Sequence, residues 1–343
     1  MMKNICFGLL LLLATLSSCE NKEWVFPDYE YQSTYFAYQY PVRTIVLGED
    51  IFDTSLDNEH KFKVMATTGG VYDNSKDVTI DVVVDNTLAE GLLFTEGGTE
   101  VLPLPSNYYT LASDKIVIPK GELIGGVEVQ LTDAFFADPL ALKNTYVLPM
   151  YMTNVVNADS ILSGKPLVEN PRRVVATNWS VAPKDYVLYA VKYVNPWHGI
   201  YLRRGKDVIA GKNEDRSLDQ TIVRQKQYVE QDEVIKLATQ SLGEVELPLV
   251  FKNSEGENID ATLLLHFDEQ GNITVRAGSE GYTATGSGKF VKRGEKNSWG
   301  SKDRDAIYLQ YEVDLEEMHV ASTDTLVLRD RGVAMETFSP VIK

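Results

Sequence analysis

Short runs of apolar and β-branched residues, separated by turn formers, occupy the first half of the chain. Six of the seven residues from Val78 to Val84 are β-branched, and Val127, Val129 and Leu131 alternate with polar residues. Both patterns are typical of strands. Turn formers such as Gly69-Gly70 lie between the runs. Regularly spaced short strands without a long helical period predict a β-sandwich.

The best helix candidate in this half runs from Asp133 to Leu142 and is interrupted by Pro139. A proline inside a helix removes a backbone donor and clashes with the preceding turn. We therefore expect no more than a short turn of helix there.

The second half carries longer strand candidates in close succession. They are Tyr186 to Val194, Ile200 to Arg204, Gln220 to Val229, Glu233 to Thr239, Val245 to Lys252, Ala261 to Phe267, Ile273 to Ala277, Tyr282 to Val291, Ile307 to Asp314 and Leu326 to Arg329. Consecutive strands joined by tight turns favour an up-and-down meander, and closure into a barrel removes the exposed edges. We predict a lipocalin-like (calycin) antiparallel barrel, with an open sandwich as the alternative.

Between the two halves, residues 163–184 break the strand pattern with one glycine and three prolines. A short, polar, proline-rich stretch is typical of an interdomain linker. The predicted organisation is a β-sandwich domain at 19–165, a linker at 166–184 and a β-barrel domain at 185–343.

An apolar run from Ile5 to Leu16 follows Lys3 at the N-terminus. It is too short to cross a bilayer core of about 30 Å, but it fits a secretory signal peptide. The run ends at Leu16-Ser17-Ser18-Cys19, which resembles the lipobox of bacterial lipoproteins. We expect residues 1–18 to be removed and Cys19 to carry a stable lipid anchor. The alternative is a buried N-terminal helix that ends in an ordinary cysteine.

The cysteine content and the net charge further limit the kinds of bonds and partners that the protein can have. Cys6 lies in the predicted signal peptide, so the mature chain has no second thiol and no disulfide is possible. Loss of Lys3 changes the formal net charge from −16 to −17. This excess of acidic residues argues against nucleic acid as a partner, because phosphate binding needs clustered Lys and Arg. We expect the acidity to serve solubility.

Several segments resemble a family of Bacteroidota outer-membrane lipoproteins. Those of its N-terminal domain of unknown function are Tyr38 to Asp50, Ser55 to Asn58, Gly69 to Tyr72, Asn107 to Leu111, Leu131 to Pro139 and Tyr146 to Pro149. Val191 to Gly205 and Asp324 to Phe338 resemble the C-terminal domain that commonly follows it. The resemblance implies an immunoglobulin-like sandwich before a lipocalin-like barrel, and an origin in polysaccharide-utilisation gene clusters. It implies no catalytic residue.

No catalytic or metal-binding signature is found in the sequence. The four histidines lack zinc-site spacing, and no G-x-S-x-G elbow for a serine nucleophile exists. We therefore predict no catalytic residue, metal or cofactor. Glycoside hydrolysis needs only two carboxyl groups about 5 to 10 Å apart, and the 49 acidic residues leave such a pair open.

Aromatic side chains are the remaining clue to a ligand, because flat rings stack on the apolar face of sugars. Trp197 and His198 lie in a predicted turn, Asn195 to Gly199, and Trp299 follows a second predicted loop. Arg203 has the chemistry to bind an acidic sugar, although a salt bridge is the more ordinary role. The predicted ligand-binding residues are Trp197, His198, Arg203 and Trp299, and most other aromatic residues are expected in the core.

Together these features predict a non-catalytic lipoprotein of the outer membrane, exposed at the cell surface. Its expected role is to bind glycans or to help take them up, together with other outer-membrane glycan-uptake proteins. The alternative is a glycoside hydrolase, or another carbohydrate-acting enzyme, whose acid pair the sequence does not reveal. A purely structural envelope protein is the third possibility.

Overall fold

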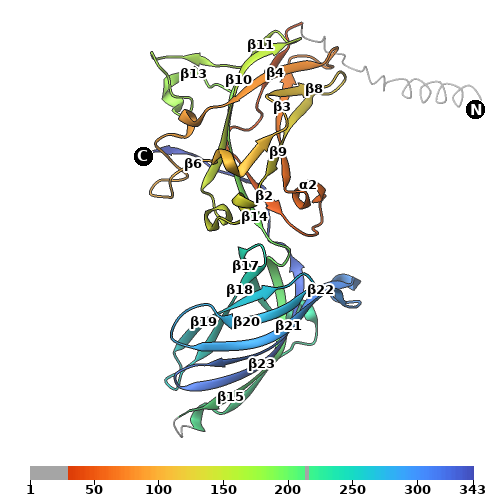
Figure 1. Cartoon of the computed structure of the whole chain (residues 1–343), viewed down its shortest axis with the longest axis vertical. Coiled ribbons are helices and arrows are strands. Elements are labelled where there is room, and N and C mark those ends of the chain that lie inside the picture. The colour runs from red at the N-terminus through yellow and green to blue at the C-terminus, as the bar shows by residue number, and fades with distance from the viewer. Residues whose placement is uncertain (1–29, 213–215) are drawn as a thin grey trace, which may run out of the picture.

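The computed structural model describes residues 30–212 and 216–343, which form two β-rich halves (Figure 1). The predicted all-β class, with a barrel in the C-terminal part, is confirmed. Cys19 and the predicted signal peptide lie outside the described residues. No helix within the described ranges is long and apolar enough to cross a membrane.

One large sheet forms the first half. Its strands follow the order β11-β1-β3-β9-β8-β4-β10-β14-β2-β24, with β6 and β7 pairing at the side. The bounds are β1 (Ser33–Tyr35), β2 (Pro41–Val46), β3 (Lys61–Gly69), β4 (Val78–Val84), β6 (Leu102–Pro103), β7 (Tyr109–Leu111), β8 (Lys115–Ile118), β9 (Ile124–Leu131), β10 (Tyr146–Val156), β11 (Ser160–Ile161), β14 (Tyr186–Val194) and β24 (Glu336–Thr337).

This sheet encloses its own core. Alternate residues of β3 and β9 are buried, as expected for strands with one face inward. Their inward side chains share one apolar cluster with those of β4, β10 and β14. The ring of Phe62 on β3 stacks on Tyr189 of β14, with 5.2 Å between centroids. Strands that are distant in the sheet order therefore face each other across the core, as in a sandwich.

The segment predicted as an interrupted helix forms two separate turns. A single α-turn, α3 (Asp133–Phe136), precedes a 3-10 turn, η3 (Pro139–Leu142). Pro139 opens the second turn, where a missing N–H costs nothing, and the Asp138 carboxylate accepts from the Leu140 N–H at 2.9 Å. The prediction of no more than a short turn of helix is confirmed.

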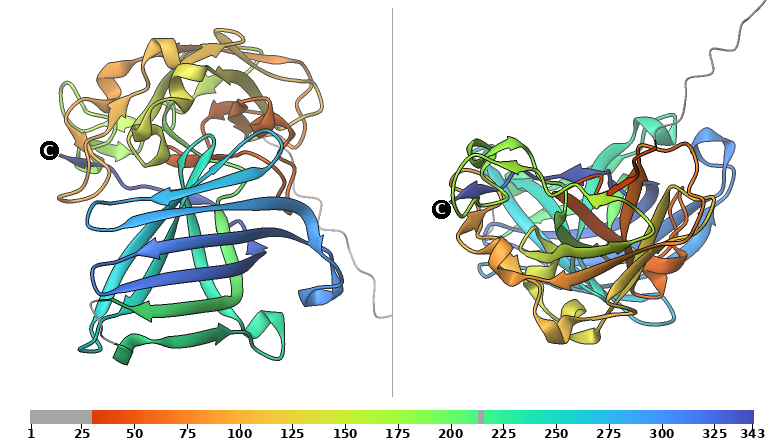
Figure 2. Two further views of the ribbon diagram at one scale, coloured as in Figure 1. Left: turned by 60° about the horizontal axis from the view of Figure 1, so that its bottom comes forward. Right: turned by 90° about the horizontal axis from the view of Figure 1, so that it is seen from above.

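Eight antiparallel strands close into a barrel in the second half (Figure 2). They are β15 (Gly199–Gly211), β17 (Glu233–Ser241), β18 (Glu244–Lys252), β19 (Asn258–Phe267), β20 (Asn272–Ala277), β21 (Thr283–Glu295), β22 (Arg304–Asp314) and β23 (Met318–Asp330). The barrel closes because β23 pairs back onto β15 over the length of both strands. The short strand β16 (Gln220–Arg224) pairs antiparallel with residues 205–209 of β15. Large aliphatic and aromatic side chains fill the interior.

Strand pairing places the passage between the two halves after residue 194. Strand β14, which the sequence analysis assigned to the second domain, pairs with β10 and β2 of the first sheet. The tail returns to the first half as well, where β25 (Val341–Ile342) pairs with β5 (Leu92–Leu93). The proline-rich stretch at 166–184 forms most of a separate two-stranded sheet, β12 (Lys165–Pro166) and β13 (Trp179–Val181). The chain then continues into β14 of the first sheet, so these prolines do not mark the end of that sheet.

Candidate functional site

A turn of four residues, Asn195 to His198, joins the two halves. The Asn195 side-chain oxygen accepts from the backbone N–H groups of Trp197 (3.2 Å) and His198 (3.0 Å). Its amide nitrogen donates to the carbonyl oxygens of Ser241 (2.8 Å) and Glu244 (2.9 Å). The predicted turn is therefore present, and one fully buried side chain ties it to the barrel.

The loop that follows β2 lies directly against this turn. Gly48 has a φ of +87°, and a Cβ atom there would lie 3.0 Å from the Cβ of Pro196. Glycine is favoured on both counts, because other residues rarely adopt this φ and a Cβ atom would be in unusually tight contact with Pro196. The Leu47 N–H also donates to the Val194 carbonyl at 3.1 Å.

Arg331, directly after β23, binds the two halves together. Its guanidinium donates to the carbonyl oxygens of His198 (2.7 Å) and Asn195 (2.6 Å) in the turn. It also donates to those of Glu49 (2.8 Å) and Leu47 (3.1 Å) in the loop after β2. Only 4% of the residue is exposed, and burial lowers the pKa of Arg331.

A groove runs along this junction. Its larger part is a cavity of about 650 Å³ between the loop at 49–52, the β21–β22 hairpin and the chain at 328–333. A second cavity of about 470 Å³ lies beside it on the first half, and its lining includes Tyr38 and Tyr189. Both cavities have Phe52 and Val333 in their walls, so they adjoin each other at these two residues. We call it the junction groove.

Trp299 lies on the wall of the junction groove, in the loop between β21 and β22. Its indole nitrogen donates to the Leu328 carbonyl at 3.1 Å. The guanidinium carbon of Arg304 lies 3.4 Å from the ring centroid, and Arg304 Nε donates to the Trp299 carbonyl at 3.2 Å. Stacking of this kind holds both planar groups in place, so the indole is fixed with one face covered by Arg304.

Trp197 and His198 lie among packed side chains. Trp197 stacks on Phe267 with 4.0 Å between ring centroids and meets the edge of Phe290. His198 is buried, and its Nδ1 accepts from the Thr239 N–H at 3.1 Å. Burial, aided by the nearby cation Lys236, lowers the pKa of His198 to about 4, so its ring is neutral at neutral pH.

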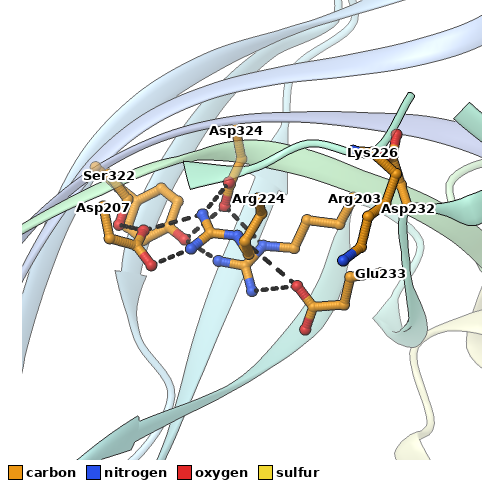
Figure 3. A network of polar contacts seen from close by, with 9 residues as sticks. Arg203, Asp207, Arg224, Lys226, Asp232, Glu233, Ser322 and Asp324 are labelled. Carbon is orange, nitrogen blue, oxygen red and sulfur yellow. Dashed lines mark hydrogen bonds and ion pairs between the residues drawn. The ribbon is translucent and has the colours of Figure 1, made fainter. Parts of the chain in front are cut away.

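Arg203 points into the barrel and belongs to a buried polar cluster (Figure 3). Each of its three guanidinium nitrogens donates to a protein group: Nε to Asp324 (2.9 Å), Nη1 to Glu233 (3.3 Å) and Nη2 to the Tyr311 hydroxyl (3.0 Å). Burial alone lowers the pKa of Arg203, but these three neighbours outweigh it and raise the pKa overall.

A second guanidinium completes this cluster. Arg224 on β16 forms an ion pair with Asp207 of β15 and donates to Asp324 of β23 at 2.6 Å. The Ser322 hydroxyl donates to Asp207 at 2.6 Å. The cluster thus links five strands around the point where the barrel closes. Within residues 30–212 and 216–343, no group of three or more His, Cys, Asp or Glu is arranged to hold a metal ion.

Two known families match separate parts of the chain, and the C-terminal match begins where the strand pairing places the passage to the barrel. Residues 196–332 match a domain of unknown function, DUF5627, and residues 29–159 match an N-terminal domain family. None of the curated proteins compared with the chain matches it.

One solved structure resembles the chain throughout. It is a Bacteroides ovatus protein of unknown function, 49% identical in sequence, covering 92% of this chain and 100% of its own, with a TM-score of 0.88. The chain belongs to this Bacteroides family. A Bacteroides thetaiotaomicron protein described as an auxiliary nutrient binding protein is 14% identical over 86% of this chain and 95% of its own. Its TM-score of 0.37 is too low to carry over fold or function.

Of the four predicted ligand-binding residues, the structure therefore places Trp299 on the groove and the other three in packed surroundings. The sequence analysis missed Tyr38, Phe52 and Arg304 as groove residues. Arg304 follows Trp299 by five residues across a hairpin loop, which is a usable local signal. Tyr38 and Phe52 come from the first half, and no local sequence pattern links them to Trp299.

Proposed function

We propose that this protein is a non-catalytic glycan-binding protein and that the junction groove is its binding site. The observation that carries the proposal is the groove itself: two adjoining cavities at the junction of the two halves, with a fixed tryptophan in the wall of the larger one. Ligand sites of small molecules are concave, and they combine aromatic surface with a few well-placed polar groups.

The chemistry of the wall suits a sugar. Arg304 covers one face of the Trp299 indole, so the proposal places the CH groups of a pyranose ring against the opposite face. Charged side chains surround it, including Asp50, Lys302 and Asp305. Carboxylates accept hydrogen bonds and ammonium groups donate them, so sugar hydroxyls find both kinds of partner around the stacked ring.

The groove is also held in one shape. Arg331 hydrogen-bonds both halves, and the Asn195 turn is tied to the barrel. A site that needs little ordering on binding loses less conformational entropy, and more of the contact energy remains as affinity.

We expect the substitution Trp299→Ala to weaken glycan binding by about 1 to 3 kcal/mol, or about 5- to 150-fold in Kd. The reason is that alanine removes the stacking surface while the rest of the groove remains. Binding is measured by isothermal titration calorimetry after a screen of the soluble mature chain against a polysaccharide panel.

Trp179→Ala is the matched control for this substitution. The Trp179 indole also donates to a backbone carbonyl, that of Arg172 at 2.8 Å, but the residue lies in the first half and lines neither cavity of the groove. Unchanged binding by a folded Trp299→Ala variant, or an equal loss in both variants, would remove the groove as the site.

We further propose that the protein is a lipoprotein anchored at the outer-membrane surface through Cys19, where it serves glycan uptake. The support is the signal-peptide pattern that ends at Leu16-Ser17-Ser18-Cys19. We expect Cys19→Ala to abolish incorporation of labelled palmitate and to remove the protein from the washed outer-membrane fraction, because only the thiol accepts the lipid. Cys6→Ala, inside the same segment, is the control and should be lipidated normally. Palmitate labelling of the Cys19→Ala chain would contradict the proposal.

A further inference from the structure

We propose that the ligand of the junction groove is an uncharged oligosaccharide that extends along both cavities. This inference rests on the proposed function and names the class of glycan. It is drawn from the balance of charges in the groove wall and from the wall that the two cavities share at Phe52 and Val333.

Opposite charges are equal in number in the wall of the larger cavity. The acidic residues are Glu49, Asp50, Asp303, Asp305 and Asp330. The basic residues are Arg293, Lys302, Arg304, Arg329 and Arg331. Five of each give a formal charge of zero, unlike the single-sign surface that binds an anion or a cation selectively.

Most of these charges already have partners. Glu49 forms an ion pair with Lys292, Asp303 with Lys296 at 3.0 Å, and Asp330 with Arg329 at 3.6 Å. Arg331 is buried beneath the groove and donates to carbonyl groups.

Apart from the buried Arg331, whose partners are carbonyl groups, four charged groups of the wall have no ion pair in the part of the chain that the structure describes. Two are cations, Lys302 and Arg304, and two are carboxylates, Asp50 and Asp305. Asp50 and Asp305 accept only from backbone N–H groups. A carboxylate or sulfate on the ligand would be attracted by the two cations and repelled by the two carboxylates, so it would gain little binding energy. A hydroxyl both donates and accepts, so it pairs with either sign.

The second cavity adds apolar surface and no net charge. Its two ionic side chains are paired: Arg43 with the buried Asp57, and Glu336 with Lys192 at 2.8 Å. Tyr38 and Phe52 are 64% and 41% exposed, respectively. Aromatic surfaces therefore continue from Trp299 past Phe52 to Tyr38, which suits a chain of sugar rings.

The electrostatic field of the whole protein also favours an uncharged ligand over an anionic one. A formal net charge of −16 repels polyanions at long range. At low ionic strength this repulsion slows the approach of uronate-rich or sulfated glycans, whereas a neutral glycan is unaffected.

The test is calorimetry on the soluble mature chain with two ligand series, each from the monosaccharide upward. The neutral series is taken from glucans, mannans, xylans and galactans; the anionic series comprises oligogalacturonides and chondroitin sulfate fragments. We expect a neutral series to bind, with affinity that rises with length until both cavities are filled and does not depend on salt. We expect anionic fragments of equal length to bind about tenfold more weakly or not at all.

Tyr38→Ala tests whether one ligand occupies both cavities. It should weaken binding of the longer neutral oligosaccharides and leave the shortest binding fragment, held at Trp299, unaffected. Preferential binding of anionic glycans would overturn the inference and leave the proposed function standing. The inference would also be overturned if a monosaccharide already bound with the highest affinity. The same holds if Tyr38→Ala lowered the affinity for short and long fragments equally. If the protein bound neither the neutral nor the anionic series, both this inference and the proposed function would be overturned.

Discussion

Replacing Arg331 with methionine is expected to lower the free energy of unfolding by about 3 to 5 kcal/mol, because several buried carbonyl groups lose a donor at about 1 to 3 kcal/mol each. The substitution keeps most of the side-chain volume but leaves four backbone carbonyls without their charged donor. Each buried acceptor left unpaired is costly. Urea unfolding, followed by circular dichroism, measures the change. The remaining folded protein should also bind glycan more weakly, since the groove walls lose their common support.

Arg329→Met is the matched control for Arg331→Met. Arg329 lies two residues earlier and also lines the groove, but its side chain is 50% exposed and its ion pair with Asp330 spans 3.6 Å. An exposed pair of this kind is worth about 0 to 1 kcal/mol, so the control should unfold almost like wild type. Similar free energies of unfolding for the two variants would show that Arg331 does not hold the halves together.

Asp324→Asn is expected to destabilise the barrel by about 3 to 5 kcal/mol. The Asp324 side chain is fully buried and pairs with both Arg203 and Arg224. Asparagine has nearly the same shape but no charge, so two guanidinium groups would share the single buried carboxylate of Asp207 and the half-exposed one of Glu233 (Figure 3). Thermal and urea unfolding of the soluble chain measure the effect.

Glu233→Gln is the control for this substitution. Glu233 contacts the same Arg203 at 3.3 Å, but its side chain is 45% exposed and water can replace it. The loss should stay within about 1 kcal/mol. If Asp324→Asn were as stable as Glu233→Gln, the cluster would not depend on the buried charge. Side-chain shape and neutral hydrogen bonds would then be enough to maintain it.

Much of the barrel could be predicted because its strands carry a local pattern. Most of the predicted strands of the second half overlap observed strands closely, since inward and outward residues alternate along each one. The exceptions include β15 and β23, of which only Ile200 to Arg204 and Leu326 to Arg329 were predicted. The missed parts contain Asp207, Ser322 and Asp324, whose polar side chains belong to the cluster around Arg203 and Arg224. A buried polar residue breaks the apolar alternation, so the pattern fails where the cluster lies.

The position of the passage between the halves could not be predicted from local composition. Prolines at 166–184 suggested a linker, but they lie in a small two-stranded sheet and in loops that precede β14, a strand of the first sheet. Strand β14 has the same apolar character as a barrel strand, and only its partners β10 and β2 assign it to the first sheet. Pairing depends on contacts between residues distant in sequence, which periodicity does not contain.

For the candidate site, the sequence by itself determined that Trp299 stands in a loop and that Asn195 to His198 form a turn, because glycine, proline and asparagine encode turns locally. Only the tertiary structure decided that Trp197 packs on Phe267 while Trp299 borders a groove. The groove exists because Arg331 brings together Leu47 and Glu49 of the first half and the turn before the barrel. These segments are separated by well over a hundred residues in the chain, and hydrogen bonds across such distances arise from the packing of whole sheets, which no local pattern records.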